Sequence, residues 1–143
     1  MRTLSFIDDI DREIIEILKR NARTPYTTIA KKLGLSEAAI RKRISKLLRQ
    51  GVIKRFTIEY SLQNEIKAVV LVKTSPQVPV FKISKEIANL QGVDHVYEIT
   101  GEYDVLAVIR ASNVLALDSI INSIRNIDGV SGTNTMIILN IRL

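Results

Sequence analysis

The stretch SEAAIRKRISKLLRQGVI, residues 36–53, predicts a helix around which the rest of the chain is organised. The hydroxyl of Ser36 can accept a hydrogen bond from a free backbone N–H of the first helical turn, where the helix dipole also favours the negative charge of Glu37. Gly51 can adopt the left-handed conformation in which many helices end. We therefore expect a helix of about three to four turns between Ser36 and Gly51.

This helix has an apolar face and a basic face. At about 100° per residue, one side carries Ile40, Ile44, Leu47 and Leu48. The opposite side carries Ala38, Lys42, Ser45 and Arg49, flanked by Arg41 and Lys46. Small residues between long cations let the backbone approach a surface closely, and a DNA major groove is wide enough to admit one helix. The alternative is an ordinary solvated face of an amphipathic helix, and this stretch alone leaves both open.

A first helix is predicted upstream, where apolar residues recur with helical spacing from Ile10 to Leu18. Three acidic residues, Asp8, Asp9 and Asp11, stand at its start and basic residues stand at its end. The helix dipole favours this distribution, and we attribute the acidic cluster to it.

A second, short helix follows the break that contains Pro25, with Thr27 or Thr28 as its cap. The turn at 34–36 then leads into the basic helix. Two short helices joined by such a turn are typical of a helix-turn-helix, whose second helix normally enters the major groove. Because that member is here also the basic one, the pattern favours DNA binding over a merely solvated face.

After Gly51, β-branched and aromatic residues up to Tyr60 predict a strand pair or wing. Lys54 and Arg55 either contact phosphates beside the groove or are solvated charges at a sheet edge, and Lys31 and Lys32 leave the same choice. The candidate DNA contacts are Ser36, Ala38, Arg41, Lys42, Arg43, Ser45, Lys46, Arg49, Lys54 and Arg55.

Charge divides the chain of 143 residues into unequal parts. Residues 1–62 hold 14 Lys/Arg against 7 Asp/Glu, whereas residues 63–143 hold 7 against 8. A basic part joined to a near-neutral part suggests one module for a polyanion and another for a different task. The absence of cysteine excludes disulfides and thiolate metal sites and fits a cytoplasmic protein, and no apolar run is long enough for a membrane.

The near-neutral part predicts a ferredoxin-like β-α-β-β-α-β module. We expect strands at 66–74, 93–100, 104–110 and 130–143, a helix at 80–90, and a second helix capped by Ser112 or Asn113 and ended by Gly129. The repeat of IANLQGV (87–93) as IRNIDGV (124–130) supports two similar halves. The whole is an α+β protein with a winged helix-turn-helix domain at 1–60, a linker at 61–65 and the ferredoxin-like domain at 66–143.

The last strand also predicts a dimer. Its alternation keeps apolar side chains on both faces, including Met136 and Ile138 on one of them, but helices cover only one face of such a sheet. A symmetric dimer through the sheets would bury the other face and present two recognition helices to one duplex. Scattered surface apolarity is the alternative.

The motifs together resemble the Lrp/AsnC transcriptional regulators, also called feast/famine regulators, and especially their short archaeal members. They are IDREII (10–15) with Leu18 and NAR (21–23), IA (29–30) with LGLS (33–36), RI (43–44) with Leu47 and GVI (51–53), and TGEYD (100–104). The resemblance covers nearly the whole chain. It implies control of amino-acid metabolism, a C-terminal domain of the RAM type that binds an amino acid, and dimers that assemble into tetramers or octamers.

The resemblance also implies an effector site near the turn at 101–104. Lysine or glutamine are the effectors that it suggests. The implied site residues are Gly101, Tyr103, Asp104, Thr133, Thr135 and, more weakly, Asp118.

Chemistry gives the turn at 101–104 two interpretations. Gly101 allows close approach, backbone N–H groups can hold a carboxylate, and Asp104 or Glu102 can pair with an ammonium group. The other interpretation is a hairpin turn whose Asp bonds its own backbone.

Nothing in the sequence predicts catalysis. The one histidine, His95, is expected to be structural or exposed, and no metal, phosphate-loop or nucleophile motif occurs, so we expect no enzyme, cofactor or metal. Two other functions stay open: a basic helical module for an acidic protein or RNA with an oligomerising ferredoxin-like half, and a regulatory subunit of an amino-acid-binding enzyme.

Overall fold

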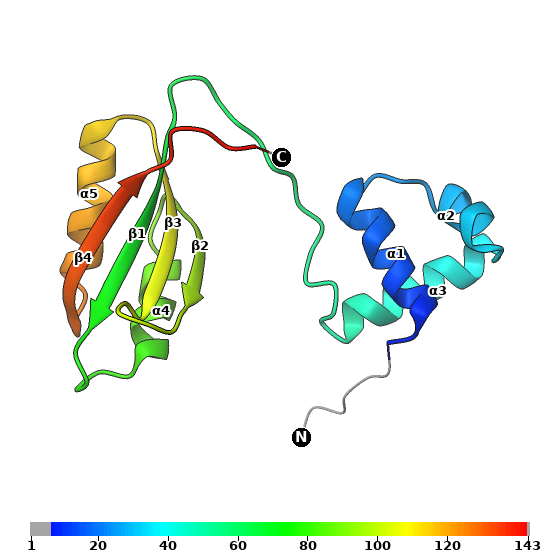
Figure 1. Ribbon diagram of the computed structural model, residues 1–143, viewed down its shortest axis with the longest axis horizontal. Helices are drawn as coiled ribbons and strands as arrows, with labels where there is room; N and C mark the ends of the chain where they lie inside the picture. The colour runs from blue at the N-terminus through cyan, green and yellow to red at the C-terminus, as the bar shows by residue number, and fades with distance from the viewer. Residues whose placement is uncertain (1–6, 143) are drawn as a thin grey trace. The chain divides into compact units, whose positions relative to one another are not determined.

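The computed structural model describes residues 7–142 and divides into two compact units, Met1–Tyr60 and Ser61–Leu143. Figure 1 shows the first unit as a group of helices and the second as a sheet backed by helices. Each unit has its own buried core.

The first unit contains the three predicted helices, α1 (Asp9–Arg20), α2 (Tyr26–Leu33) and α3 (Glu37–Arg49). Ser36 caps α3, since its Oγ accepts a hydrogen bond of 3.1 Å from the Ala39 N–H. The expected threonine cap of α2 is wrong: Pro25 stands at the N-cap, without a side-chain hydrogen bond. Proline fixes a φ that suits a helix start, so the helix begins before the threonines.

Apolar residues from all three helices form the core of this unit: Ile14, Leu18, Ile29, Ala30, Ile40, Ile44 and Leu47. Leu48, expected on the apolar face of α3, is instead 39% exposed. It lies about 100° around the helix from Leu47, at the border of the buried stripe.

The predicted strand pair or wing at 52–60 is wrong for the single chain. Residues 54–60 form no helix or strand, and side chains such as Phe56 and Ile58 are exposed. A strand needs a neighbour for its backbone hydrogen bonds. The described part of the chain pairs no strand with this segment.

The second unit has the predicted ferredoxin-like order. Its elements are β1 (Ile66–Thr74), α4 (Val80–Ala88), β2 (Val93–Glu98), β3 (Val105–Ala111), α5 (Val114–Arg125) and β4 (Val130–Ile137). The antiparallel sheet has the strand order β2-β3-β1-β4, with α4 and α5 on one face (Figure 1). Asn113 is the cap of α5, since its Oδ1 accepts a hydrogen bond from the Ala116 N–H.

The internal repeat corresponds to two equivalent turns. The helices α4 and α5 both have an asparagine as the C-cap, Asn89 and Asn126. The glycines that precede β2 and β4 have almost equal φ angles, +88° at Gly92 and +89° at Gly129. The backbone of Val93 bonds Leu90, as that of Val130 bonds Ile127. Each turn thus returns the chain from a helix to a strand in the same way.

The last strand is shorter than predicted. It ends at Ile137, opposite Ala68, and the Ile138 N–H still donates to the Lys67 carbonyl oxygen at 2.8 Å. In this register Leu139 would stand opposite Ile66, the first residue of β1, so residues 140–142 extend beyond the start of β1 and have no residue of that strand to pair with. Leu143, which we also expected in this strand, lies outside the described residues.

Candidate DNA-binding and effector sites

The basic face of α3 is exposed as predicted from its period. The side chains of Ala38, Lys42, Ser45 and Arg49 are all exposed, as is that of Arg41 beside them. Lys42 and Arg49 make no ion pair with any residue that the structure describes. This face therefore offers cations to a polyanion together with two small side chains that permit close approach.

Arg41 has contacts within the unit, although it is exposed. Its Nη2 donates to Glu37 Oε1 at 2.6 Å, and its guanidinium carbon lies 5.0 Å from the ring centroid of Tyr26 on α2. These contacts hold the side chain beside α2, at the edge of the basic face. No pattern in the sequence predicts this contact of Tyr26.

The structure separates Arg43, with Lys46 beside it, from the exposed basic face of α3. Its Nη1 donates to Asp8 Oδ2 at 2.7 Å and to Asp11 Oδ1 at 2.8 Å. Asp11 is 1% exposed, and the Nζ of Lys46 lies 3.9 Å from its second oxygen. Arg43 thus faces α1, and the attribution of Asp11 to the helix dipole is incomplete, because this carboxylate is buried against a cation of α3.

The ionisation of this cluster agrees with its geometry. The pKa of Asp8 is lowered, first by the hydrogen bond from the Asp11 backbone and then by that from Arg43. The pKa of Arg43 is raised by its hydrogen bonds to Asp8 and Asp11. The sequence held a signal for the cluster, since Asp11 shares the buried stripe of Ile14 and Leu18 at helical spacing, and a buried carboxylate requires a partner.

The remaining candidate DNA contacts lie at the ends of α3. Ser36 is exposed, but its hydroxyl already caps the helix. Lys54 and Arg55 are exposed in the extended segment that follows the turn at Gly51, and Arg55 has a partner within the chain. They are therefore not part of the face formed by Lys42 and Arg49.

In the effector turn, Asp104 bonds the end of β1. Its Oδ2 accepts hydrogen bonds of 2.8 Å from both the backbone N–H and the hydroxyl of Thr74. These two hydrogen bonds lower the pKa of Asp104, and the bond from the Thr74 backbone N–H has the larger effect. The Asp therefore bonds the end of β1, thirty residues away, and not the backbone of its own turn as the hairpin interpretation expects. Glu102 is exposed in the same turn, and Gly101 has a φ of +122° with open space at its Cβ position.

Sheet register brings this turn and Thr133 to one end of the sheet. Val72 pairs with Val105, next to Asp104, on one side and with Thr133 on the other. Thr133 and Thr135 lie on the helix-covered face, because their partners Val72 and Val70 are buried under the helices, and Thr133 Oγ1 accepts a hydrogen bond from Arg125 Nε on α5.

The other two implied effector residues differ in placement. Tyr103 is half-buried in the turn beside Asp104. Asp118 is exposed on α5, where it accepts a hydrogen bond from Asn122. It lies seven residues, about 10 Å along the helix, before Arg125, so the structure does not bring it next to Thr133.

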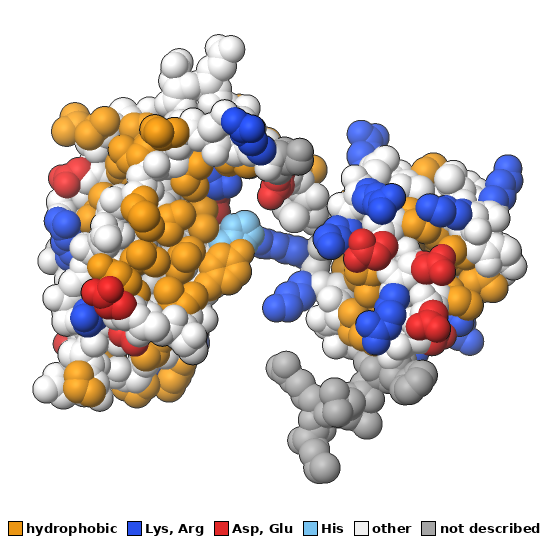
Figure 2. Space-filling model, in the orientation of Figure 1, with side chains coloured by type: hydrophobic (Ala, Val, Ile, Leu, Met, Phe, Trp, Pro, Cys, Tyr) orange, Lys and Arg blue, Asp and Glu red, His pale blue; other side chains and the backbone are white. Residues whose placement is uncertain are grey.

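The second face of the sheet is apolar, and neither helix of this unit, α4 or α5, covers it. Register places on it Val69, Leu71, Leu106, Val108, Tyr97 and Met136. We call this set the open face; Figure 2 shows it as a broad orange area on the second unit. His95, expected to be structural or exposed, is exposed there and stacks on Tyr97 with ring centroids 6.2 Å apart.

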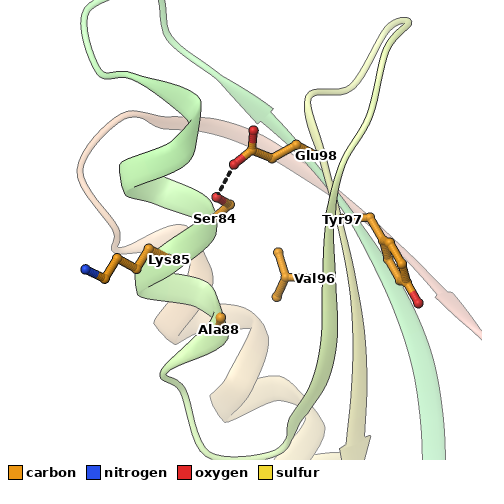
Figure 3. A pocket seen from close by; sticks show the side chains of 6 residues that line it. All are labelled: Ser84, Lys85, Ala88, Val96, Tyr97 and Glu98. Atoms are coloured by element: carbon orange, nitrogen blue, oxygen red, sulfur yellow. Dashed lines mark hydrogen bonds between the residues drawn. The ribbon is translucent and has the colours of Figure 1, made fainter. Parts of the chain in front are cut away.

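A shallow hollow of about 460 Å³ lies between α4 and β2, away from all predicted residues. Figure 3 shows Ser84 donating to Glu98 across it, at 2.6 Å. This bond satisfies the nearly buried hydroxyl of Ser84, so the contact has a structural role. Within residues 7–142, no cluster of His, Asp or Glu is fit to bind a metal, and no helix is long and apolar enough to cross a bilayer.

Comparison with known protein families matches both units. The model of the AsnC-type helix-turn-helix domain matches residues 7–48, and that of the Lrp/AsnC ligand-binding domain matches residues 67–142. The chain is 60% identical over 133 residues to the HTH-type transcriptional regulator LysM of Saccharolobus solfataricus, covering 93% of this chain and 94% of the relative.

Solved structures agree with this assignment. E. coli AsnC is similar with a TM-score of 0.76 and 29% identity, over 96% of this chain and 95% of that one. A feast or famine regulatory protein of M. tuberculosis, in complex with L-methionine, is similar with a TM-score of 0.83 and 25% identity, over 95% and 94% of the two chains. The sequence and its fold together show that this chain belongs to the Lrp/AsnC family of transcriptional regulators.

Proposed function

We propose that this protein is a cytoplasmic regulator of amino-acid metabolism that binds duplex DNA through α3 and responds to an amino acid at its C-terminal domain. The observation that carries the proposal is the exposed pair Lys42 and Arg49 on the second helix of a helix-turn-helix, with the small residues Ala38 and Ser45 on the same face. Long cations can reach phosphates and base edges, while the small residues let the helix enter the groove.

The open face supports action as a homodimer. Exposed apolar surface of this kind marks an interface, and pairing two copies through it would give two recognition helices for two half-sites. Assembly of dimers into tetramers or octamers follows from the resemblance to the family.

For the effector, the end of the sheet that joins the turn at 101–104 to Thr133 is the proposed site. Asp104 is engaged with Thr74, so we assign the pairing with an effector ammonium group to the exposed Glu102, and Asp104 shapes the turn. The M. tuberculosis relative solved with L-methionine supports an amino acid as the class of ligand. Lysine and glutamine are the first candidates.

DNA binding is tested by selecting a duplex from a random pool with the purified protein and competing it against a base-shuffled duplex. A specific regulator should prefer the selected duplex by about 10³-fold or more. Equal affinity for the two duplexes would contradict the proposal and favour the alternative of a general basic interaction module.

The effector is tested by measuring the melting temperature with each of the twenty amino acids. A ligand that binds only the folded state raises the melting temperature as its concentration exceeds its Kd. An effector should also change affinity for the selected duplex, whereas absence of any shift would contradict the sensing role alone.

A further inference from the structure

A charged contact joins the start of α1 to the middle of α3. The Nη1 of Arg43 bonds carboxylates of both Asp8 and Asp11, and Lys46 lies beside the second oxygen of Asp11. Asp8 also caps α1, since its Oδ1 accepts the Asp11 N–H at 2.8 Å. One guanidinium group therefore holds the cap and the first turn of one helix against the recognition helix.

This charged contact can fix the orientation of α3 against α1, which apolar packing alone does not. Apolar packing between α1 and α3 involves Ile14, Leu18, Ile44 and Leu47. The hydrophobic effect that stabilises this packing has no preferred direction. A guanidinium bound to two carboxylates has a defined geometry, and one of them, Asp11, is buried. The ion pairs therefore restrict rotation and sliding of α3 against α1.

Arg43 is also directed away from the basic face. It lies about 100° around α3 from Lys42, and only 28% of its side chain is exposed, against 63% for that of Arg41. In the described residues, Oδ2 of Asp11 accepts no hydrogen bond, so Arg43 and Lys46 are the cations that compensate this buried charge.

We propose that Arg43 and Asp11 are positioning residues for DNA recognition: they orient α3 so that Lys42 and Arg49 meet the groove, and Arg43 does not contact DNA itself. This deepens the proposed DNA-binding function and rests on it. A misoriented helix keeps its charges, so it still attracts phosphates but loses the alignment that base readout needs.

The proposal predicts an unusual sign for Asp11→Asn. Removing an acidic charge from a DNA-binding protein ordinarily strengthens its attraction to phosphates. Here the loss of the ion pair should instead lower affinity for the selected duplex by about tenfold, while affinity for shuffled duplex stays equal or rises. Asp9→Asn is the matched control, because Asp9 is exposed in the same turn of α1 and makes no ion pair within residues 7–142.

Salt dependence separates positioning from phosphate contact. Binding to selected and shuffled duplexes is measured at several salt concentrations for the wild type and for Arg43→Gln, Arg43→Lys, Asp11→Asn, Asp9→Asn and Lys42→Ala. Loss of a phosphate contact lowers the slope of log K against log salt by about one per bound helix, as expected for Lys42→Ala. Arg43→Gln should lower specific affinity about tenfold and leave the slope unchanged.

The outcomes are distinct. A reduced slope for Arg43→Gln, or unchanged or tighter specific binding by Asp11→Asn, would overturn the proposal. Circular dichroism at the assay temperature reports whether each variant is folded, and Arg43→Lys, which keeps the charge, replaces Arg43→Gln if the latter unfolds. If the wild type does not prefer its selected duplex, the proposed function itself fails, and this inference fails with it.

Discussion

Several charged side chains of this protein act within the fold, although their residue types suggest ligand contacts. Arg43 binds Asp8 and Asp11, and Asp104 binds Thr74. Burial of a charged group without a partner is costly, and in each case a residue distant in the sequence supplies the hydrogen bond. What remains exposed for a ligand is the smaller set that includes Lys42 and Arg49.

Lys42→Ala and Arg49→Ala should each weaken binding to the selected duplex about five- to tenfold, because each removes an exposed cation from the basic face. Fluorescence anisotropy at several salt concentrations checks this. Lys82→Ala, on α4 of the other unit, is the control and should behave as the wild type. Equal affinities for Lys42→Ala, Arg49→Ala and the wild type would remove this face from the interface.

Asp104→Asn should destabilise the second unit in a manner that depends on pH. The folded pKa of Asp104 is lowered by the hydrogen bonds from Thr74. Its contribution is therefore present above the unfolded pKa, about 3.9, and is lost as the pH falls through the folded pKa.

Urea unfolding of the wild type and Asp104→Asn at pH 7 and pH 3 tests this dependence. We expect a difference of about 1–3 kcal/mol at pH 7, as for hydrogen bonds to a charged group, and a smaller one at pH 3. Thr74→Val, which keeps the backbone donor, should have a smaller effect at pH 7. A difference that does not change with pH would contradict a role for the ionised carboxylate.

Helix and strand boundaries follow the caps and glycine turns of the sequence where the fold also supplies the partners that the element needs. The cap at Ser36 and the two glycine turns lie where the sequence predicts. The segment at 54–60 and residues 139–142 have strand-like composition, yet they form no strand because no partner strand adjoins them. Strand pairing involves two segments, so the sequence of one segment does not by itself determine whether it forms a strand.

Gly129→Ala should destabilise the second unit by ~3 kcal/mol. A Cβ there would lie 2.6 Å from the Cβ of Val78 and 2.9 Å from Cδ1 of Ile83, at a φ of +89°. Backbone strain costs about 1–3 kcal/mol, and overpacking costs about 1–3 kcal/mol more. Thermal or urea unfolding measures the effect.

Gly132→Ala is the control for this substitution. Gly132 lies on β4, its φ is not positive and no atom approaches its Cβ position within 4 Å. It should leave the free energy of unfolding within about 0.5 kcal/mol of the wild type. Equal losses for both variants would show that the turn at Gly129 is not strained by a side chain.

For the whole molecule, the main consequence of the fold is that the helices cover one face of the sheet and leave the open face apolar. One chain presents one recognition helix. A second copy bound at the open face would present a second recognition helix, so the number of DNA contacts would double with the same residues in each copy.

Leu106→Asp should convert the protein to a folded monomer. Leu106 stands between Leu71 and Tyr97 on the open face, so a charge there opposes burial against a second copy. Light scattering should give the mass of one chain, and affinity for the selected duplex should fall about 10²-fold or more with the loss of bivalent binding.

Leu115→Asp is the matched control. Leu115 is 83% exposed on α5, in the layer opposite the open face, so its variant should remain at least dimeric. A Leu106→Asp protein that stays dimeric would place the interface elsewhere.

Much of the architecture was predictable because it depends on periods and caps within short windows. The helical period of 10–20 and 37–49, the strand at 66–74 and the order of elements in the second unit match the structure. The candidate DNA helix was predictable for the same reason, since charge and period together define its exposed face. Arg43 stands among the candidate DNA contacts because the sign of a charge does not reveal which partner it meets.

The amino-acid order was thus sufficient for the identity of the elements, the basic face of α3 and the family motifs, since these depend on neighbours within a few turns of the chain. The folded chain was needed to show that Asp11 meets Arg43 across two helices, that Asp104 meets Thr74, and that β4 ends where β1 begins. These features arise between segments from 30 to about 70 residues apart, where packing and backbone pairing, rather than local periodicity, determine which groups meet.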